Sequence, residues 1–241
     1  MAFKDGDFIE IEYTAWNAAD NGVIFTTDEK KAKEAGIYDE KGRYGPVLVV
    51  LGSRSVVKGL EKGLHEMSLN ETKRFELSPE EAFGERSEEL VKVIPLSEFR
   101  KRDIAPYPGM SIDIDNMPAI VKSVNSGRVV VDANHPYAGR KIVYEVKVVK
   151  QLLDDKEKIQ GLGKVYNVEP TTVEISGDVA KLGYGKDFNK DANYFVNKAN
   201  LIASIFSYFE KIKKVEIKED YERPAEQKEK DEKDNKAENK A

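Results

Sequence analysis

The chain has 241 residues, and at roughly 100 to 200 residues per domain we expect two domains with an insertion or a tail. Lys and Arg total 39 against 44 for Asp and Glu, and the net charge of −5 excludes a general affinity for nucleic-acid backbones. The absence of cysteine excludes disulfides, thiolate nucleophiles and cysteine metal sites, and favours a reducing compartment.

The sequence contains few residues that could bind a metal and no apolar run long enough to span a membrane. The only histidines, His65 and His135, lie outside any carboxylate motif, so we expect structural roles for both. The N-terminal segment is charged where a signal peptide would be apolar, and no run approaches the ~18 to 20 apolar residues that a membrane span needs. We therefore expect a cytoplasmic chain with no membrane, nucleic-acid, metal or cofactor partner.

The first elements are strands separated by polar connections. Apolar and polar residues alternate over residues 9–15, which is the period of a half-buried strand, and residues 20–22 supply a turn. A polar, lysine-rich stretch at 28–43 then reads as a loop that enters a buried strand at 47–51.

A short amphipathic helix is expected over residues 56–67. Val57, Leu60, Leu64 and Met67 recur at intervals of three and four, which places them on one helix face. Its interior glycines, Gly59 and Gly63, lower helix propensity, so they need a reason such as close packing or backbone exposed to a ligand. A strand at 72–77 and an irregular loop at 79–84 follow.

Residues 88–132 differ in character from the segments on either side. Short apolar runs are divided by Pro95, Pro106, Pro108 and Pro118 and by a turn at 125–127, which is typical of a small, mostly β unit. Strict alternation returns over residues 142–148, and the polar residues 154–156 mark a boundary.

The final third predicts a separate α+β domain. We expect a helix at 156–166, a hairpin turning at 175–179, a long helix at 191–213 and a strand at 215–218. The long helix has an apolar stripe on each of two sides; the stripes are Phe195, Ala199, Ile202, Phe206 and Phe209, and Tyr194, Leu201 and Tyr208. The second side either binds another copy of the chain, giving a homodimer, or is buried within the domain. Residues 222–241 are too poor in apolar side chains to fold.

Acid–base and nucleophilic motifs are absent, and paired carboxylates such as Glu80 and Glu81 read as solvated surface. What remains is a set of apolar and aromatic residues near strand ends, loops and the short helix, where a pocket can form. These residues are Tyr13, Phe25, Val47, Val56, Val57, Leu60, Phe83 and Tyr144. The alternative is that they form an ordinary hydrophobic core.

Successive motifs carry a resemblance to a known family. They are the segments 22–25, 51–64 and 79–84, in that order. Together they resemble the FKBP family of peptidyl-prolyl cis–trans isomerases. The β-rich interruption after Gly84 and the return through residues 134–144 are similar to the SlyD-like branch, whose insert-in-flap domain binds unfolded chains. The last third resembles the long archaeal FKBP type.

The resemblance implies roles for individual residues. Most of the apolar set would line the prolyl pocket, Leu60 would form its floor, and the Val57 N–H would donate to a substrate carbonyl. Two positions depart from the family pattern. Thr26 stands where the family usually has Asp, and Phe83 where it commonly has Tyr. Thr26 can still offer a hydroxyl to the site, and Asp28 is near in sequence. The tail lacks the His and Cys of metal-binding relatives.

These expectations combine into an α+β fold with an FKBP-like antiparallel half-barrel around a short helix. Residues 1–86 and 132–153 form the half-barrel, 87–131 the chaperone insert, 154–221 the C-terminal domain and 222–241 the tail. The expected function is prolyl isomerisation and chaperoning of unfolded or nascent chains. The alternative is a non-catalytic holdase that grips clients through its C-terminal domain and through insert residues Val91, Ile94, Ile112, Met117, Ile120 and Val121.

Overall fold

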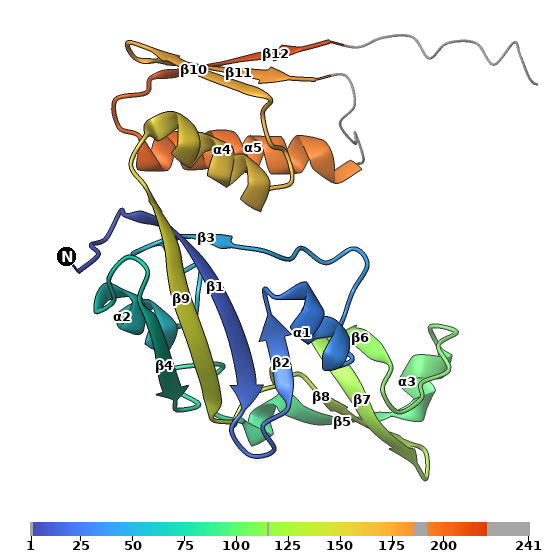
Figure 1. The fold of residues 1–241 in the computed structure, drawn as a ribbon. Coiled ribbons are helices and arrows are strands. Elements are labelled where there is room, and N and C mark those ends of the chain that lie inside the picture. The colour runs from blue at the N-terminus through green and yellow to red at the C-terminus, as the bar shows by residue number, and fades with distance from the viewer. Residues whose placement is uncertain (1, 115, 186–191, 221–241) are drawn as a thin grey trace, which may run out of the picture. The chain divides into compact units, whose positions relative to one another are not determined.

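The chain divides into two compact units, Met1–Leu152 and Leu153–Ala241. The structure is a computed structural model that describes residues 2–114, 116–185 and 192–220 (Figure 1). No helix within these ranges is long and apolar enough to cross a membrane. The tail expected at 222–241 lies outside the described residues.

The first unit is built on a five-stranded antiparallel sheet in the order β2-β1-β9-β4, with β3 also paired to β1 (Figure 1). Its strands are β1 Phe8–Asn17, β2 Val23–Thr26, β3 Val47–Val50, β4 Thr72–Leu77 and β9 Ile142–Leu152. The alternation expected over 9–15 is confirmed, because Ile9, Ile11 and Ala15 are fully buried. These side chains pack against Leu60 and Leu64 of helix α2, Lys58–His65, and so form the core of the half-barrel.

The glycines of α2 are explained by close packing. A Cβ on Gly63 would lie 2.5 Å from Cε1 of Phe75, and a Cβ on Gly59 would lie 2.6 Å from Cδ2 of Leu77. The Gly59 amide also donates to the carbonyl oxygen of Glu81, in the loop after β4. Only glycine lets the helix approach β4 and this loop so closely.

The expectation of a loop throughout residues 28–43 is wrong, because helix α1 spans Glu29–Glu34. Asp28 caps its N-terminus by accepting from the amides of Lys30 and Lys31. A single apolar side chain, Ala32, is buried beneath the helix. One buried alanine produces no hydrophobic periodicity, so the sequence carried no periodic signal for this helix, and a capping aspartate alone does not predict one.

The insert forms a sheet of its own, with four strands in the order β5-β8-β7-β6. Its elements are the 3-10 turn η1 Glu88–Leu90, β5 Val91–Pro95, α3 Leu96–Arg100, β6 Ser111–Ile114, β7 Met117–Asn125 and β8 Arg128–Asp132. A small core of Phe99, Val121, Val129 and Val131 holds it together. The expected β-rich character of this segment is therefore confirmed.

The second unit contains two helices and a three-stranded sheet in the order β10-β11-β12. Its elements are α4 Asp155–Val165, β10 Thr172–Ser176, β11 Val179–Tyr184, α5 Ala192–Tyr208 and β12 Lys214–Glu219. The expected hairpin and the closing strand are confirmed, with β12 parallel to β11. The long helix ends at Tyr208 rather than at 213, since residues 209–213 turn back so that Ile212 and Phe209 are buried.

Candidate active site

The first unit contains an apolar cavity of about 500 Å³ that is lined by the sheet and the start of α2. The sheet, the loop before α2, and the loop after β4 all contribute to its wall. The lining residues are Ile11, Tyr13, Phe25, Val47, Leu48, Val49, Arg54, Ser55, Val56, Val57, Leu60, Phe83 and Tyr144. Every residue of the pocket-forming set expected from the sequence is among them, so the structure brings that set together.

The floor and the side walls come from different elements. Leu60 projects from the first turn of α2 and is 2% exposed, which places an aliphatic side chain at the base. Tyr13 of β1 and Tyr144 of β9 face each other with ring centroids 6.0 Å apart. Phe25 of β2 and Phe83 of the loop after β4 close the other side at 6.1 Å. The walls are therefore aromatic rings, three of them from strands of the sheet and one, Phe83, from the loop after β4.

A short loop between β3 and α2 carries the polar edge of the cavity. The Glu61 carboxylate accepts hydrogen bonds from the amides of Gly52 at 2.9 Å and Arg54 at 3.4 Å, which holds the loop against the helix. Val57 is the residue before the first turn of α2. The hydrogen bonds of the described residues include no acceptor for the Val57 amide, so this N–H is available at the cavity wall.

Burial sets the protonation of the cavity's phenols. Desolvation, together with the neighbouring Tyr13 ring, raises the pKa of Tyr144 to about 12. Burial also raises the pKa of Tyr13 above its ordinary value. A phenol of ordinary pKa is already neutral at physiological pH, and burial extends this neutrality to more alkaline pH, so these rings place no anion in the cavity.

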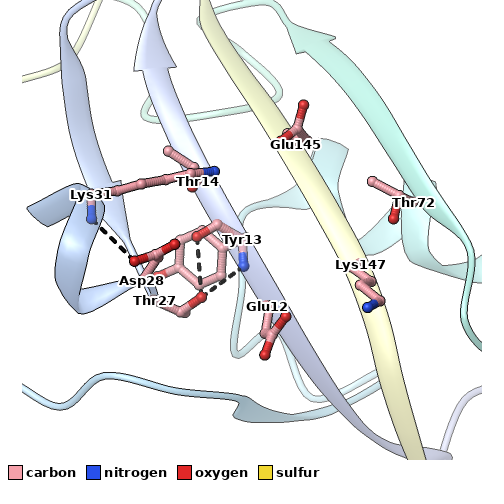
Figure 2. Close-up of a pocket in the computed structure, with 9 residues that line it drawn as sticks. All are labelled: Glu12, Tyr13, Thr14, Thr27, Asp28, Lys31, Thr72, Glu145 and Lys147. Carbon is pink, nitrogen blue, oxygen red and sulfur yellow. Dashed lines mark hydrogen bonds between the residues drawn. The ribbon is translucent and has the colours of Figure 1, made fainter.

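Thr26 and Asp28 do not contribute to this cavity. The Thr26 hydroxyl lies 2.9 Å from the Thr14 hydroxyl and accepts from the Asp28 amide at 3.1 Å. Asp28 lines a separate polar depression of about 330 Å³, formed with outward-facing residues of the sheet such as Thr14 and Glu145 (Figure 2). Alternation along the strands turns these side chains away from the apolar cavity. The Thr26 hydroxyl therefore forms hydrogen bonds with Thr14 and the Asp28 amide, and the Asp28 carboxylate caps α1, so neither group faces the apolar cavity.

Comparisons with known proteins give two family matches. The family described as "FKBP-type peptidyl-prolyl cis-trans isomerase" matches residues 1–98, and the family described as "FKBP26, IF domain" matches residues 92–137. A short-type peptidyl-prolyl cis-trans isomerase of Methanocaldococcus jannaschii is 32% identical over 145 residues, which cover 60% of this chain and 91% of that protein. The chain belongs to the FKBP-type peptidyl-prolyl cis-trans isomerases.

Two further relatives of this FKBP-type isomerase are bacterial. The isomerase SlyD of Pasteurella multocida is 30% identical to this chain, and the matched region covers 54% of this chain and 67% of SlyD. The 16 kDa FKBP-type isomerase of Escherichia coli is 28% identical to this chain, and the matched region covers 44% of this chain and 73% of that protein. The likeness to SlyD agrees with the β-rich insert, so the chain is an FKBP-type, SlyD-like enzyme.

The insert residues singled out from the sequence fall on two faces of its sheet. Ile94 and Ile112 pack against the insert core, and Val121 is fully buried within it. Asp132 of β8 pairs with Val91 on one neighbouring strand and with Ile120 on the other, so these three residues share one face of the sheet. This face is opposite to the one that forms the insert core. Met117 is 38% exposed at the end of the β6–β7 hairpin. Val121 therefore stabilises the insert and offers no surface to a client.

Sequence reasoning missed the most exposed apolar side chains of the insert. Val93 is 59% exposed and lies beside Val130 on the face of Val91, while Tyr107 is 62% exposed in the loop after α3. Alternation between Ile94 inside and Val93 outside was a signal in the sequence. It did not identify the outer residue because both are apolar.

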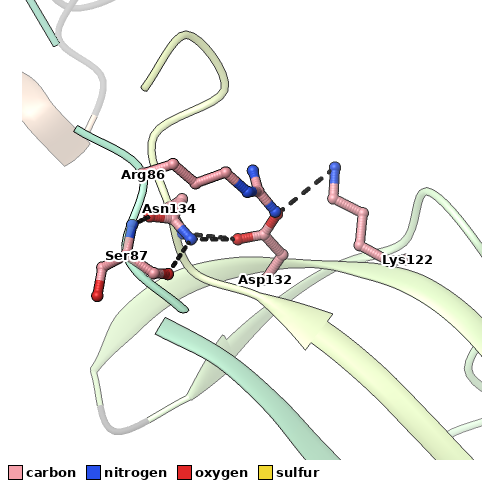
Figure 3. A network of polar contacts seen from close by, with 5 residues as sticks. All are labelled: Arg86, Ser87, Lys122, Asp132 and Asn134. Atoms are coloured by element: carbon pink, nitrogen blue, oxygen red, sulfur yellow. Dashed lines mark hydrogen bonds and ion pairs between the residues drawn. The ribbon is translucent and has the colours of Figure 1, made fainter. Parts of the chain in front are cut away.

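A polar clamp joins the two segments that connect the insert to the half-barrel (Figure 3). Arg86 Nη2 donates to Asp132 at 2.5 Å, and Lys122 Nζ lies 3.8 Å from the same oxygen. The Asn134 side chain bonds both the amide and the carbonyl of Ser87, at 2.8 and 2.9 Å, and donates to Asp132 at 2.8 Å. Burial opposes ionisation, but the bonds from Asn134 and Arg86 outweigh it and lower the pKa of Asp132. The clamp holds both crossing segments in one register.

Proposed function

We propose that this isomerase acts on X–Pro bonds of unfolded or nascent polypeptides by burying the prolyl ring in the cavity between Tyr13, Phe25, Leu60, Phe83 and Tyr144. The observation that carries the proposal is the convergence of these side chains on one apolar cavity of about 500 Å³. A prolyl ring is small and apolar, and aromatic walls over an aliphatic floor match it. The absence of cysteine supports a cytoplasmic location for this activity.

The reaction needs few polar groups. Rotation about the X–Pro bond breaks amide resonance against a barrier of about 18 to 20 kcal/mol, and no covalent bond changes partner. The twisted amide loses charge separation, so a cavity that removes water from it favours the transition state over the planar ground state. The Val57 N–H fixes the substrate by donating to a carbonyl oxygen. The neutral phenols of Tyr13 and Tyr144 add no charge to the cavity, whose lining includes the charged side chain of Arg54.

The first test measures refolding of a protein limited by a trans-to-cis prolyl step. The wild type is expected to accelerate it, and the Phe83→Ala, Tyr144→Ala double variant is expected to lose most of this effect, since each lost aromatic wall costs about tenfold if it contributes ~1.4 kcal/mol. Tyr38→Ala is the matched control, because Tyr38 is an exposed aromatic side chain that does not belong to the lining set. Full activity in the folded double variant would sink the assignment of the site.

The insert supports a second, chaperone function. We propose that its outer face, with Val91, Val93, Ile120 and Val130, binds apolar segments of unfolded chains and presents their prolines to the cavity. The supporting observation is that Val93 on this face is 59% exposed although it is apolar, and Tyr107, in the loop after α3, adds a second exposed apolar side chain on the insert. The C-terminal unit is the other candidate for client binding.

The Val93→Ser, Tyr107→Ser variant separates the two functions. Isomerisation of a short peptide is expected to stay within about twofold of wild type, whereas suppression of aggregation and refolding of a large unfolded protein should fall severalfold, because that apolar area no longer binds clients. Arg100→Ser, Lys101→Ser provides a control with polar positions on the same insert. Equal loss in both assays would contradict this division of labour.

A further inference from the structure

An aromatic stack continues beyond the residues that line the cavity. The imidazole of His135 lies parallel to the Phe83 ring, with centroids 4.3 Å apart and an interplanar angle of 5°. Tyr137 contacts Phe83 and Phe25 from the side, at 5.7 and 5.4 Å. Phe83 is half-buried, so its cavity-facing position depends on what covers the remainder of the ring. His135 provides that cover from the solvent side, where it is itself exposed.

The orientation of the imidazole is fixed by its own loop. The Tyr137 amide donates to Nδ1 of His135 at 3.2 Å, which requires that this nitrogen be unprotonated. Immediately before it in sequence, Asn134 is anchored to Ser87 and Asp132 by side-chain hydrogen bonds. The ring is therefore held from both sides, by the clamp at the insert junction and by the turn that follows.

The two segments that connect the insert to the half-barrel are also in contact at this stack, where Phe83 packs on His135. Phe83 lies three residues before Arg86, and His135 lies three residues after Asp132, while Arg86 and Asp132 form the ion pair of the clamp. The stack of Phe83 on His135 is thus the point where the insert connection touches the wall of the cavity.

We propose that His135 is a positioning residue of the isomerase site, which holds the Phe83 ring in place as a wall of the cavity by stacking on its outer surface. This inference rests on the proposed function and deepens it. It concerns a residue that does not line the cavity and that acts only through Phe83.

Three substitutions at His135 distinguish the contribution of the stacked ring from that of the hydrogen bond to Nδ1. His135→Ala removes both, His135→Asn keeps an acceptor for the Tyr137 amide but removes the ring, and His135→Phe keeps the stacking ring but removes the acceptor. We expect kcat/KM on a short X–Pro peptide to fall about two- to tenfold in the Ala and Asn variants, and to return to within about twofold of wild type in the Phe variant. Because the side chain is exposed, the variants are expected to fold.

A double-mutant cycle with Phe83→Ala supplies the decisive readout. If His135 acts through Phe83, His135→Ala has no further effect once the Phe83 ring is gone. A purely structural role would lower kcat/KM by the same factor on both backgrounds and would overturn the proposal. His65→Ala is the control, since this histidine bonds Phe3 and Asp5 at the far end of α2 and should leave kcat/KM unchanged.

The failures of the two proposals are distinguishable. If Phe83→Ala lowers kcat/KM about tenfold while His135→Ala and His135→Asn retain it in full, the role of His135 is refuted and the proposed function stands. If Phe83→Ala is itself fully active, the assignment of the cavity fails, and the role of His135 fails with it.

Discussion

Single residues decide how polar the cavity is. Thr26 and Phe83 stand where the family pattern has a carboxylate and a phenol, and the structure adds that Thr26 and Asp28 face away from the cavity. The polar atoms that remain at its wall belong to Tyr13, Tyr144, Ser55, Arg54 and the backbone. We therefore propose that catalysis in this chain depends on desolvation and shape more than on a charged group.

The raised pKa of Tyr144 predicts a loss of stability at alkaline pH. In the unfolded chain the phenol ionises from about pH 10, whereas in the folded chain its pKa is about 12. Between these values the unfolded state binds fewer protons, so stability falls as pH rises, by roughly 2 kcal/mol over the window. Below pH 10 this contribution is fully present.

Urea unfolding followed by the fluorescence of Trp16, the single tryptophan, measures this effect in the half-barrel. The free energy of unfolding of Tyr144→Phe should decline less steeply than that of wild type between pH 10 and 12. Parallel curves for the two proteins would show that Tyr144 does not retain its proton on folding.

At the scale of elements, the position of α2 against β4 determines where the cavity floor lies. Gly63 and Gly59 let the helix approach Phe75 and Leu77 closely, and Leu60 between them forms the floor. The helix also places the Val57 amide at the wall. A small shift of α2 would therefore change the depth of the cavity and the direction of this donor together.

Gly63→Ala tests this packing. An alanine gains about 1 kcal/mol of helix propensity, but its Cβ would lie 2.5 Å from the Phe75 ring, and overpacking costs about 1 to 3 kcal/mol. We expect a net loss of up to about 2 kcal/mol in urea unfolding, together with lower kcat/KM as the floor shifts. Lys62→Ala, at an exposed position of the same helix, should be neutral. A stabilised, fully active Gly63→Ala would show that the contact relaxes freely.

At the scale of the whole molecule, α5 carries apolar residues on two sides. Tyr194 and Leu201 of one predicted stripe are buried within the second unit, whereas Tyr208, the third residue of that stripe, is 37% exposed. The other stripe is open along the described helix, with Phe195 58% and Phe206 45% exposed. Phe209 was expected in this open stripe but is buried, because the helix ends before it. Isolated exposed apolar side chains are common, but a stripe of this kind is typical of an interface.

We propose that this stripe binds the same helix of a second copy, giving a homodimer. Phe195→Glu, Phe206→Glu is expected to convert a dimer into a monomer, since paired carboxylates in an apolar interface are strongly unfavourable. Sedimentation equilibrium measures the mass, with Asn200→Glu, on the polar side of α5, as the control. A wild type that sediments as a monomer would refute the proposal.

Most of the strands and helix α2 could be predicted from the sequence alone, because strand alternation and helix spacing depend on local geometry, whereas the assignment of eight apolar residues to a pocket came from the resemblance of the ordered motifs to the FKBP family. The helix at 29–34 could not, since one buried alanine leaves no periodic signal. Which face of the insert is core, and where Thr26 points, were also settled only by tertiary structure. Both depend on which strands pair and in which register, and this pairing joins residues far apart in the chain. The stack of His135 on Phe83 has the same origin: residues 52 positions apart meet because the insert begins and ends at one clamp.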